Sequence, residues 1–375
     1  MKTLYAIGNR LFHTGIGRIA GYAALGLSRN NLLSEVVCLG HESSEIPESL
    51  HRDIKFVPRG ALPFLPDKPY YLGKNKWFDF RCRSRIRSGI DTFHCWNSQA
   101  SGALEKAASR GVLTVVDRAS SHIRTQSEIL VAAYQRHGIR YEPTYESVIR
   151  RCEREYEIAD VVVVPSQFVV DSFAERGFDM SKIVLNPFGV DADRFRPAKQ
   201  PPDRFRAIFV GQVGVRKGAP ELLQAFSRLN IPDAQLMLVG PEEVASTEAL
   251  APYRNHTDII FAGSRSDVPE LLAQSSVFVF PSWEEGSALV TYEAMAAGLP
   301  CIVTPNAGSH VVDGETGFVV TLGDIDALAD RIAWCANNRD AAYAMGQKAR
   351  KAIRPFTWDA YGKRTAQLHE KLTSR

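Results

Sequence analysis

Two acidic side chains, Glu285 and Glu293, are placed where they could bind hydroxyl groups on both sides of an anion. They lie in SWEEGSALVTYEAMAAGLP, which follows the strand-like run VFVFP and has the pattern of a loop leading into a helix. Glu285 then falls on the loop, and Glu293 about two turns inside the helix. Carboxylates accept strong hydrogen bonds from hydroxyls. This layout suits a nucleoside-diphosphate sugar, in which a diphosphate separates ribose hydroxyls from sugar hydroxyls.

The start of that helix supplies the expected anion site. We expect Ser287 to cap the helix and Gly298 to end it just before Pro300. The N–H groups of a first turn have no partner within the helix and carry the positive end of its dipole. The residues expected to face the anion are Gly286, Ser287, Ala288 and Leu289. Taken alone, the two glutamates would more often be a favourable charge at a helix start and an exposed helix residue.

A second anion site is expected in the loop 211–218, GQVGVRKG, which follows the strand-like run AIFV and precedes a helix with one apolar face. Its glycines, beginning with Gly211 before Gln212, let the backbone approach a ligand closely. Arg216 and Lys217 add positive charge beside a helix N-terminus, which suits a diphosphate. The alternative is a glycine turn with two solvated basic residues. The spacing differs from that of a P-loop.

The elements that must position these loops alternate along the chain. Apolar β-rich runs separated by helix-period segments predict an α/β fold with parallel, doubly wound, Rossmann-like sheets. The expected strands are 4–7, 36–39, 114–116, 161–164, 207–210, 235–239, 259–261, 277–280 and 301–304. Ligands of such sheets bind outside the carboxyl ends of the strands. Two sheets facing each other would therefore place both sets of loops on one cleft.

The segment 186–202, with four prolines, interrupts this alternation and predicts a hinge. The length of 375 residues also favours two domains. We expect an N-terminal acceptor-side domain over 1–188 and a C-terminal donor domain over 189–355. A final helix over 356–375 could cross back to the N-terminal domain.

Composition is that of an ordinary globular protein, with 45% apolar and 23% charged residues and a net charge of +3. That charge is too small to favour nucleic acid as a partner. None of the six cysteines belongs to a CxxC pair or a zinc-type spacing, so we expect reduced, buried thiols. No apolar run is long enough to span a membrane, and we expect a cytoplasmic protein.

Read together, these motifs resemble those of glycosyltransferase family 4, which has the GT-B fold and retains the anomeric configuration. In that family two glutamates eight residues apart bracket a glycine-containing turn and precede EAMA-x-G-x-P, which here reads EAMAAGLP. FVGQVGVRKG resembles its phosphate loop, and DGETGFVV its segment before the final helices. NPFGVDADRFRP resembles its interdomain segment. The likeness runs from about residue 155 to the C-terminus.

The resemblance implies a role for individual residues. Glu293 should bind the ribose, and Glu285 the transferred sugar, as a residue of the catalytic centre. Lys217 should bind the diphosphate, and backbone near Arg265 the base. In the first half the residues implied to touch the diphosphate or the acceptor are Gly17 and Arg18. No cofactor and no metal ion is expected, because the nucleotide sugar is itself the co-substrate and this family needs no metal.

Three positions depart from the family pattern. Gln212 stands where the family usually has arginine, and Arg216 could supply that charge. Asp117 stands where the family commonly has a histidine at a strand end, and His122 could compensate five residues on. We therefore retain Asp117 and His122 as catalytic candidates without assigning the acid–base role. His94, in a second family-like place, is more simply a structural histidine.

The segment Lys74–Arg87 combines six basic residues with three aromatic ones. It could rest on an anionic membrane surface, which would make the protein peripherally membrane-associated on the cytoplasmic face. It could also guide an acidic acceptor, or form an ordinary solvated basic face.

The sequence thus predicts a metal-independent, retaining hexosyltransferase. It would use a UDP or GDP sugar and act on a glycan or lipid-linked acceptor in cell-surface polysaccharide synthesis. One alternative is a non-catalytic module that binds sugar nucleotides or glycans. The other is an NAD-dependent oxidoreductase, because GIGRIA satisfies GxGxxA, with Glu42 near the place of the ribose-binding acid. However, its first glycine lies seven residues after Gly8, where the strand is expected to end, whereas a true fingerprint turns directly off the strand.

Overall fold

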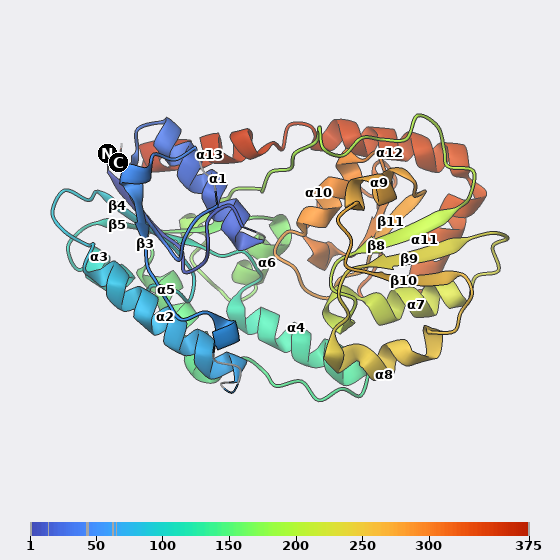
Figure 1. Ribbon diagram of the computed structural model, residues 1–375, viewed down its shortest axis with the longest axis horizontal. Coiled ribbons are helices and arrows are strands. Elements are labelled where there is room, and N and C mark those ends of the chain that lie inside the picture. Colours follow the sequence, from blue (N-terminus) through green and yellow to red (C-terminus); the bar gives the residue numbers. More distant parts are fainter. Residues whose placement is uncertain (1, 14, 43–44, 62–63, 65, 374–375) are drawn as a thin grey trace.

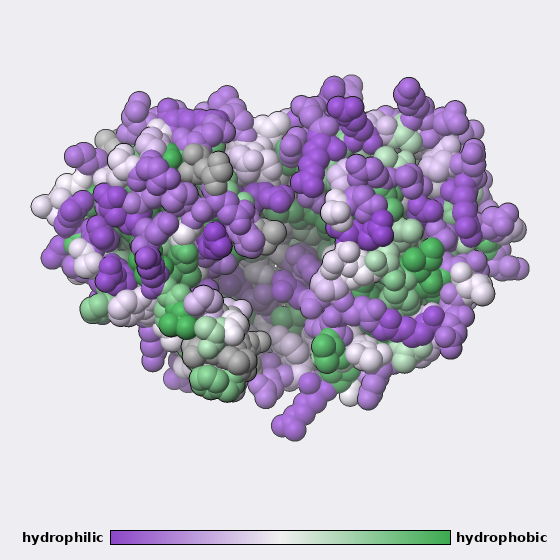
Figure 2. Space-filling view, in the orientation of Figure 1, coloured by the Kyte–Doolittle hydropathy of each residue, from purple (hydrophilic) through white to green (hydrophobic). Residues whose placement is uncertain are grey.

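The computed structural model describes residues 2–13, 15–42, 45–61, 64 and 66–373. The chain forms two α/β halves, each built on its own parallel sheet with helices on both faces (Figure 1). Figure 2 shows the surface hollowed between the two halves. Among the described residues, no helix combines the length and the apolar character needed to cross a bilayer.

The first sheet has seven parallel strands in the order β3-β2-β1-β4-β5-β6-β7. Its strands are β1 (Thr3–Ala6), β2 (Leu33–Cys38), β3 (His51–Asp53), β4 (Thr92–Trp96), β5 (Leu113–Asp117), β6 (Val161–Val164) and β7 (Ile183–Leu185). The helices of this half are α1 (Ile16–Arg29), α2 (Asp67–Arg83), α3 (Ser101–Ala108), α4 (Ile123–Arg136), α5 (Glu146–Ile158) and α6 (Gln167–Ala174).

The second sheet has six parallel strands in the order β10-β9-β8-β11-β12-β13. Its strands are β8 (Arg206–Val210), β9 (Gln235–Val239), β10 (Ile259–Gly263), β11 (Val277–Phe280), β12 (Cys301–Val303) and β13 (Gly317–Val319). Its helices are α7 (Ala219–Ser227), α8 (Thr247–Leu250), α9 (Val268–Ala273), α10 (Leu289–Ala296), α11 (Ile325–Asn337) and α12 (Arg339–Ile353). Short 3₁₀ turns connect several elements, including η1 (Glu48–Leu50), η4 (Val215–Lys217) and η7 (Pro305–Ala307).

The last helix, α13 (Trp358–Thr373), belongs to the second half in sequence but packs on α1 in the first half (Figure 1). A Cβ on Gly26 would lie 2.2 Å from the carbonyl oxygen of Gly362, so only glycine allows the two helices to approach this closely. Beside this contact, the rings of Tyr22 and Trp358 stack with their centroids 4.7 Å apart. The two halves are therefore joined by an apolar helix pair as well as by the chain.

Within the described ranges all nine expected strands are present, together with four strands that were not expected. The bounds predicted for β6, β9 and β11 are the same as those in the structure. The strands β3, β7 and β13 were missed because each has only three residues, too few to show a periodic pattern. The strand β4 was missed because its sequence, TFHCW, carries a histidine at its centre that is only 1% exposed.

Candidate functional site

Lys217 and Glu285 meet where the loop after β8 reaches the loop after β11. The ammonium of Lys217 hydrogen-bonds to Oε1 of Glu285, and Nε of Arg216 lies 3.8 Å from the same oxygen. Gly218 ends η4 with φ 73°, and a Cβ there would lie 2.0 Å from the carbonyl oxygen of Pro281. A glycine is therefore required for η4 to bring its two basic residues against the end of β11.

Glu284 is a residue of this region that the sequence motifs did not single out. Its side chain has no exposed surface and accepts a hydrogen bond from Nη2 of Arg216 at 2.9 Å. The hydroxyls of Ser120 and Ser121, which belong to the first half, donate to its Oε1 at 2.7 and 2.9 Å. Burial works to raise the pKa of Glu284, but Arg216 and these hydroxyls outweigh it and hold the pKa below its ordinary value. Glu284 thus fastens the two halves together beside Glu285.

The two backbones also touch at Gly286. A Cβ on Gly286 would lie 1.6 Å from the carbonyl oxygen of Ala119 in the loop after β5. The hydroxyl of Ser166, at the start of α6, donates to the carbonyl oxygen of Gly286. Position 286 therefore admits only glycine, and the loops after β5 and β11 form a direct contact between the halves.

The start of α10 differs from the expectation in two respects. Ser287 does not cap the helix, because Ala288 holds the N-cap position and the Ser287 hydroxyl donates to the carbonyl oxygen of Gly308 at 2.9 Å. The N–H of Ala288 donates to the carbonyl oxygen of Ala307 at 3.0 Å, so this amide is not available to an anion. The predicted end of the helix is confirmed, with α10 closing at Ala296 and Gly298 at φ 78°.

Glu293 lies on α10 and faces the first half. With Leu289 it lines a small cavity whose other walls include Arg18 from α1 and Arg194 from the hinge. In the described part of the chain, no side chain or backbone group forms a hydrogen bond or ion pair with its carboxylate. Burial raises the pKa of Glu293, although Arg18 and Arg194 oppose the shift. The Glu293 carboxylate is thus a hydrogen-bond acceptor in a partly enclosed space, and no described group donates a hydrogen bond to it.

Asp117 and His122 do not join this group. Asp117 ends β5 and accepts a hydrogen bond from the Tyr5 hydroxyl at 3.2 Å, and its Oδ2 lies 3.0 Å from Nε2 of His94. His122 caps α4 by accepting the N–H of Arg124, and its ring packs between aromatic side chains. Burial lowers the pKa of His122 to about 4. Across the described residues, neither side chain forms a hydrogen bond or ion pair with Glu285.

The remaining predicted residues lie around the same loops. Gly17 is buried in the first turn of α1, where a Cβ would lie 2.2 Å from the carbonyl oxygen of Arg10. Gly211 has φ 147° at the end of β8, and Gln212 beside it is exposed. Arg265 follows β10 and is exposed, with its guanidinium bound to Asp267 at 2.7 and 2.8 Å. The structure therefore gathers Lys217, Arg216, Glu285 and the start of α10, with Arg18 and Glu293 facing across the halves.

Sequence models of known families match both halves of the chain. The sequence model described as Glycosyltransferase Family 4 matches residues 13–194, and the model described as Glycosyl transferases group 1 matches residues 204–338. The chain belongs to glycosyltransferase family 4. The resemblance noted in the sequence is thereby confirmed, and it extends into the first half, where the motifs were weaker.

Individual relatives match part of their length. The chain is 30% identical over 230 residues to an MMP α-(1→4)-mannosyltransferase of Mycolicibacterium hassiacum, covering 58% of this chain and 56% of the relative. It is 26% identical over 289 residues to a sulfoquinovosyl transferase of Arabidopsis thaliana, covering 68% and 54%. The chain thus spans about half the length of these two relatives. It is also 28% identical to a GDP-mannose-dependent phosphatidylinositol monomannoside mannosyltransferase of Mycolicibacterium smegmatis, covering 65% and 71%.

Solved structures share the whole fold. A sucrose-phosphate synthase of Thermosynechococcus elongatus superposes with a TM-score of 0.71 at 20% identity, covering 100% of this chain and 99% of the other. HepE of Anabaena, solved in complex with UDP and glucose, superposes with a TM-score of 0.68 at 16% identity, covering 100% of both chains. These likenesses, together with two parallel-sheet halves, confirm the predicted GT-B fold.

Proposed function

We propose that this protein is a retaining glycosyltransferase that moves a hexose from a UDP or GDP sugar to a hydroxyl of a glycan or lipid-linked acceptor. The observation that carries the proposal is the pairing of Lys217 with Glu285 beside the start of α10, with the unpaired carboxylate of Glu293 farther along the same helix. The cation and the helix start suit a diphosphate. The two carboxylates suit the hydroxyl groups that lie on either side of that diphosphate in a nucleotide sugar.

The chemistry follows from the charge that develops when the sugar leaves its diphosphate. The bond between the anomeric carbon and the diphosphate oxygen breaks, and Lys217 and Arg216 stabilise the negative charge that grows on that oxygen. The acceptor hydroxyl attacks from the same face of the sugar and gives its proton to the departing phosphate. This route needs no protein nucleophile and no metal ion or cofactor. The bonds that hold Asp117 and His122 are consistent with a structural role for both.

The donor is proposed from the relatives together with the site. Relatives named for GDP-mannose, and one named for UDP-galactose acting on an undecaprenol diphosphate-linked sugar, make either nucleotide a reasonable donor. Acceptors named among them are a phosphatidylinositol mannoside and a polyprenol-linked sugar. Both of these acceptors are attached to lipids, and we propose a lipid-linked acceptor, used in building surface glycans, for this protein as well.

The exposed surface of α2 supports a membrane-associated acceptor. Trp77 and Phe80 are 40% and 64% exposed and stack on each other, and Arg81 lies 5.7 Å from the Trp77 ring centre. Phe78, the third aromatic residue of the segment, is fully buried and belongs to the core instead. Between α2 and residues 141–148 lies an open groove whose lining is mixed, with apolar side chains such as Tyr71 and Leu72 and the acidic Glu142. We propose that this side of the protein rests on an anionic cytoplasmic membrane surface.

A thermal-shift screen tests the proposal directly. A ligand present at about 100 times its Kd stabilises a protein by about 2.7 kcal/mol, which is readily measured. We expect UDP or GDP, and one of their sugars, to raise the melting temperature, while NADH leaves it unchanged. A shift with NADH alone would support the oxidoreductase alternative. Binding of a sugar nucleotide without transfer or hydrolysis, under any acceptor condition, would support the non-catalytic alternative.

A further inference from the structure

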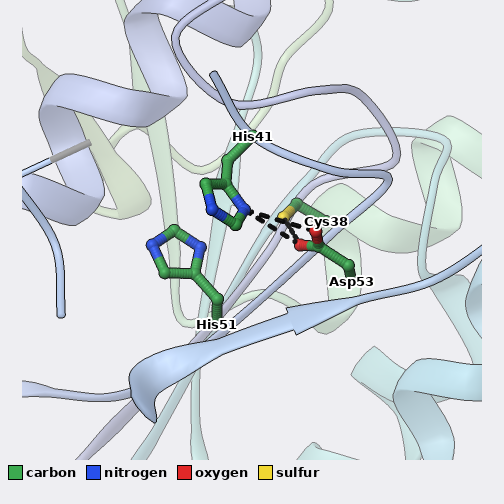
Figure 3. A group of neighbouring side chains, drawn as sticks. All are labelled: Cys38, His41, His51 and Asp53. Carbon is green, nitrogen blue, oxygen red and sulfur yellow. Dashed lines mark hydrogen bonds and ion pairs between the residues drawn. The ribbon is translucent and has the colours of Figure 1, made fainter. Parts of the chain in front are cut away.

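Four side chains that can bind metal ions gather at one corner of the first sheet, apart from the residues placed at the donor site. They are Cys38, His41, His51 and Asp53 (Figure 3). Each offers one ligand atom, and these atoms all lie within 4.8 Å of one another. No spacing in the sequence indicated this group, because the ligands come from two strands and a loop and one of those strands has only three residues.

The fold explains why these residues meet. The strand β2 and the edge strand β3 pair in parallel with Cys38 opposite Asp53, so the two side chains lie side by side on one face. Residues two apart in a strand share a face, and His51 therefore lies on the same side as Asp53. The chain turns sharply after β2 at Gly40, whose φ is 120°, and brings His41 over the other three. The His41 and His51 rings stack with their centroids 3.9 Å apart.

Both ring nitrogens of His41 face a carboxylate oxygen, so a neutral ring would leave one lone pair facing another. Nε2 of His41 lies 3.0 Å from Oε1 of Glu48, and its Nδ1 lies 3.3 Å from Oδ1 of Asp53. A neutral imidazole that donates from Nε2 carries a lone pair on Nδ1, which then faces a carboxylate oxygen. The Cys38 sulfur lies 3.1 Å from the same oxygen. Protons on these side chains would remove the repulsion between their lone pairs. A single metal ion placed among the same atoms would also remove it.

The ligand set selects among metals. One sulfur, two imidazole nitrogens and one carboxylate oxygen suit Zn²⁺, whereas Mg²⁺ and Ca²⁺ prefer oxygen ligands. Tetrahedral bonds of about 2.0–2.3 Å place ligand atoms roughly 3.3–3.7 Å apart. The separations of 3.1 and 3.3 Å at Asp53 are already close to this range. Glu48 would orient His41 from outside, as carboxylates commonly do for metal-binding histidines.

We propose that Cys38, His41, His51 and Asp53 bind one Zn²⁺ ion with a structural role. All four positions are filled by protein, as in structural rather than catalytic zinc sites. The backbone of His41 pairs with Leu11, whose N–H donates to the carbonyl oxygen of Gly40 at 2.9 Å. The ion would therefore hold the backbone at Leu11, which precedes α1 in the chain. Zinc takes no part in the transfer step, so this inference stands independently of the proposed function.

The test uses the full chain, freed of metal by a chelator and titrated with Zn²⁺ against a chromophoric competitor, and separately with Co²⁺. We expect one equivalent to bind, and Co²⁺ to give the near-ultraviolet charge-transfer band of a cobalt–thiolate bond. Cys38→Ser should abolish that band, and His51→Gln should weaken Zn²⁺ binding at least about 100-fold. Glu48→Gln, which removes only the outer carboxylate, should weaken it about 10- to 100-fold.

Matched controls separate this site from general thiol or histidine binding. His13→Gln changes an exposed histidine on the neighbouring loop, and Cys335→Ser changes a buried cysteine in the second half. Both variants should bind one Zn²⁺ as the wild type does. The proposal is overturned if the wild-type chain binds no Zn²⁺ at micromolar concentration. It is equally overturned if Cys38→Ser or Asp53→Asn, shown to be folded by circular dichroism, keeps the wild-type affinity and cobalt spectrum.

Discussion

The ammonium of Lys217 is bound by the carboxylate of Glu285, so the two charges neutralise each other. In the proposed donor complex, the diphosphate would take Lys217 from Glu285, and Glu285 would then accept a hydroxyl of the sugar. This exchange couples binding of the two ends of the donor. The lysine and the glutamate are 68 residues apart in sequence and occupy adjoining loops after β8 and β11.

Replacing Lys217 with methionine should weaken nucleoside-diphosphate binding about 10- to 100-fold, because a charge-assisted hydrogen bond contributes about 1.5–3 kcal/mol. Isothermal titration with UDP and GDP measures the change. Lys348→Met, at an exposed position on α12, removes the same charge and should leave the affinity unaltered. Equal affinities of Lys217→Met and wild type would remove Lys217 from the donor site.

Gly286→Ala should separate the loops after β5 and β11, because its Cβ would lie 1.6 Å from the carbonyl oxygen of Ala119. We expect a loss of about 1–3 kcal/mol in the free energy of unfolding, typical of overpacking, together with a large fall in transfer rate. Denaturant unfolding and a donor-turnover assay measure the two effects. Gly73→Ala, where an added Cβ meets nothing within 4 Å, should be neutral or slightly stabilising. A fully stable and active Gly286→Ala protein is incompatible with this contact.

Acid should destabilise the protein partly through His122. Burial lowers its folded-state pKa to about 4, against about 6.5 in the unfolded chain, so the folded state binds this proton less readily. The resulting stability is fully present above about pH 6.5 and is lost as the pH falls from 6.5 toward 4. His122→Asn supplies a capping oxygen in place of the ring nitrogen Nδ1, and it removes the titration. Between pH 6.5 and pH 4, the free energy of unfolding of this variant should fall by up to about 2–3 kcal/mol less than that of the wild type. Identical pH profiles would show that His122 titrates normally.

The α2 surface should bind anionic vesicles. Co-sedimentation with phosphatidylglycerol vesicles should be strong at low salt and weak at high salt, and it should be absent with phosphatidylcholine alone. Replacing both Trp77 and Phe80 with serine should reduce binding at least about tenfold. The matched control replaces Val244 and Val312, which are 89% and 49% exposed in the second half, and should bind as wild type. Binding that survives in the Trp77/Phe80 variant would place the membrane contact elsewhere.

The sequence predicted most of the second half because its strands are continuous apolar runs and its two loops carry recognisable patterns. It predicted Lys217 and Glu285 as partners of one ligand, and the structure places them in contact. It missed Glu284, because two adjacent glutamates look alike until the fold buries one against Ser120 and Ser121. It also assigned a cap to Ser287, whose hydroxyl is instead bound to Gly308 by tertiary packing. A contact between the two halves accounts for the first miss, and packing within the second half accounts for the other.

The central claim, that Glu293 binds the ribose of a nucleotide held at Lys217, is tested most directly by removing the ribose hydroxyls. Affinities of UDP and GDP are compared with those of their 2′,3′-dideoxy forms, in wild type, in Glu293→Ala and in the exposed-site control Glu315→Ala. For whichever base binds, wild type and the control should lose about 10- to 100-fold on removal of the hydroxyls, and Glu293→Ala less than about threefold. An equal penalty in wild type and Glu293→Ala would contradict the account.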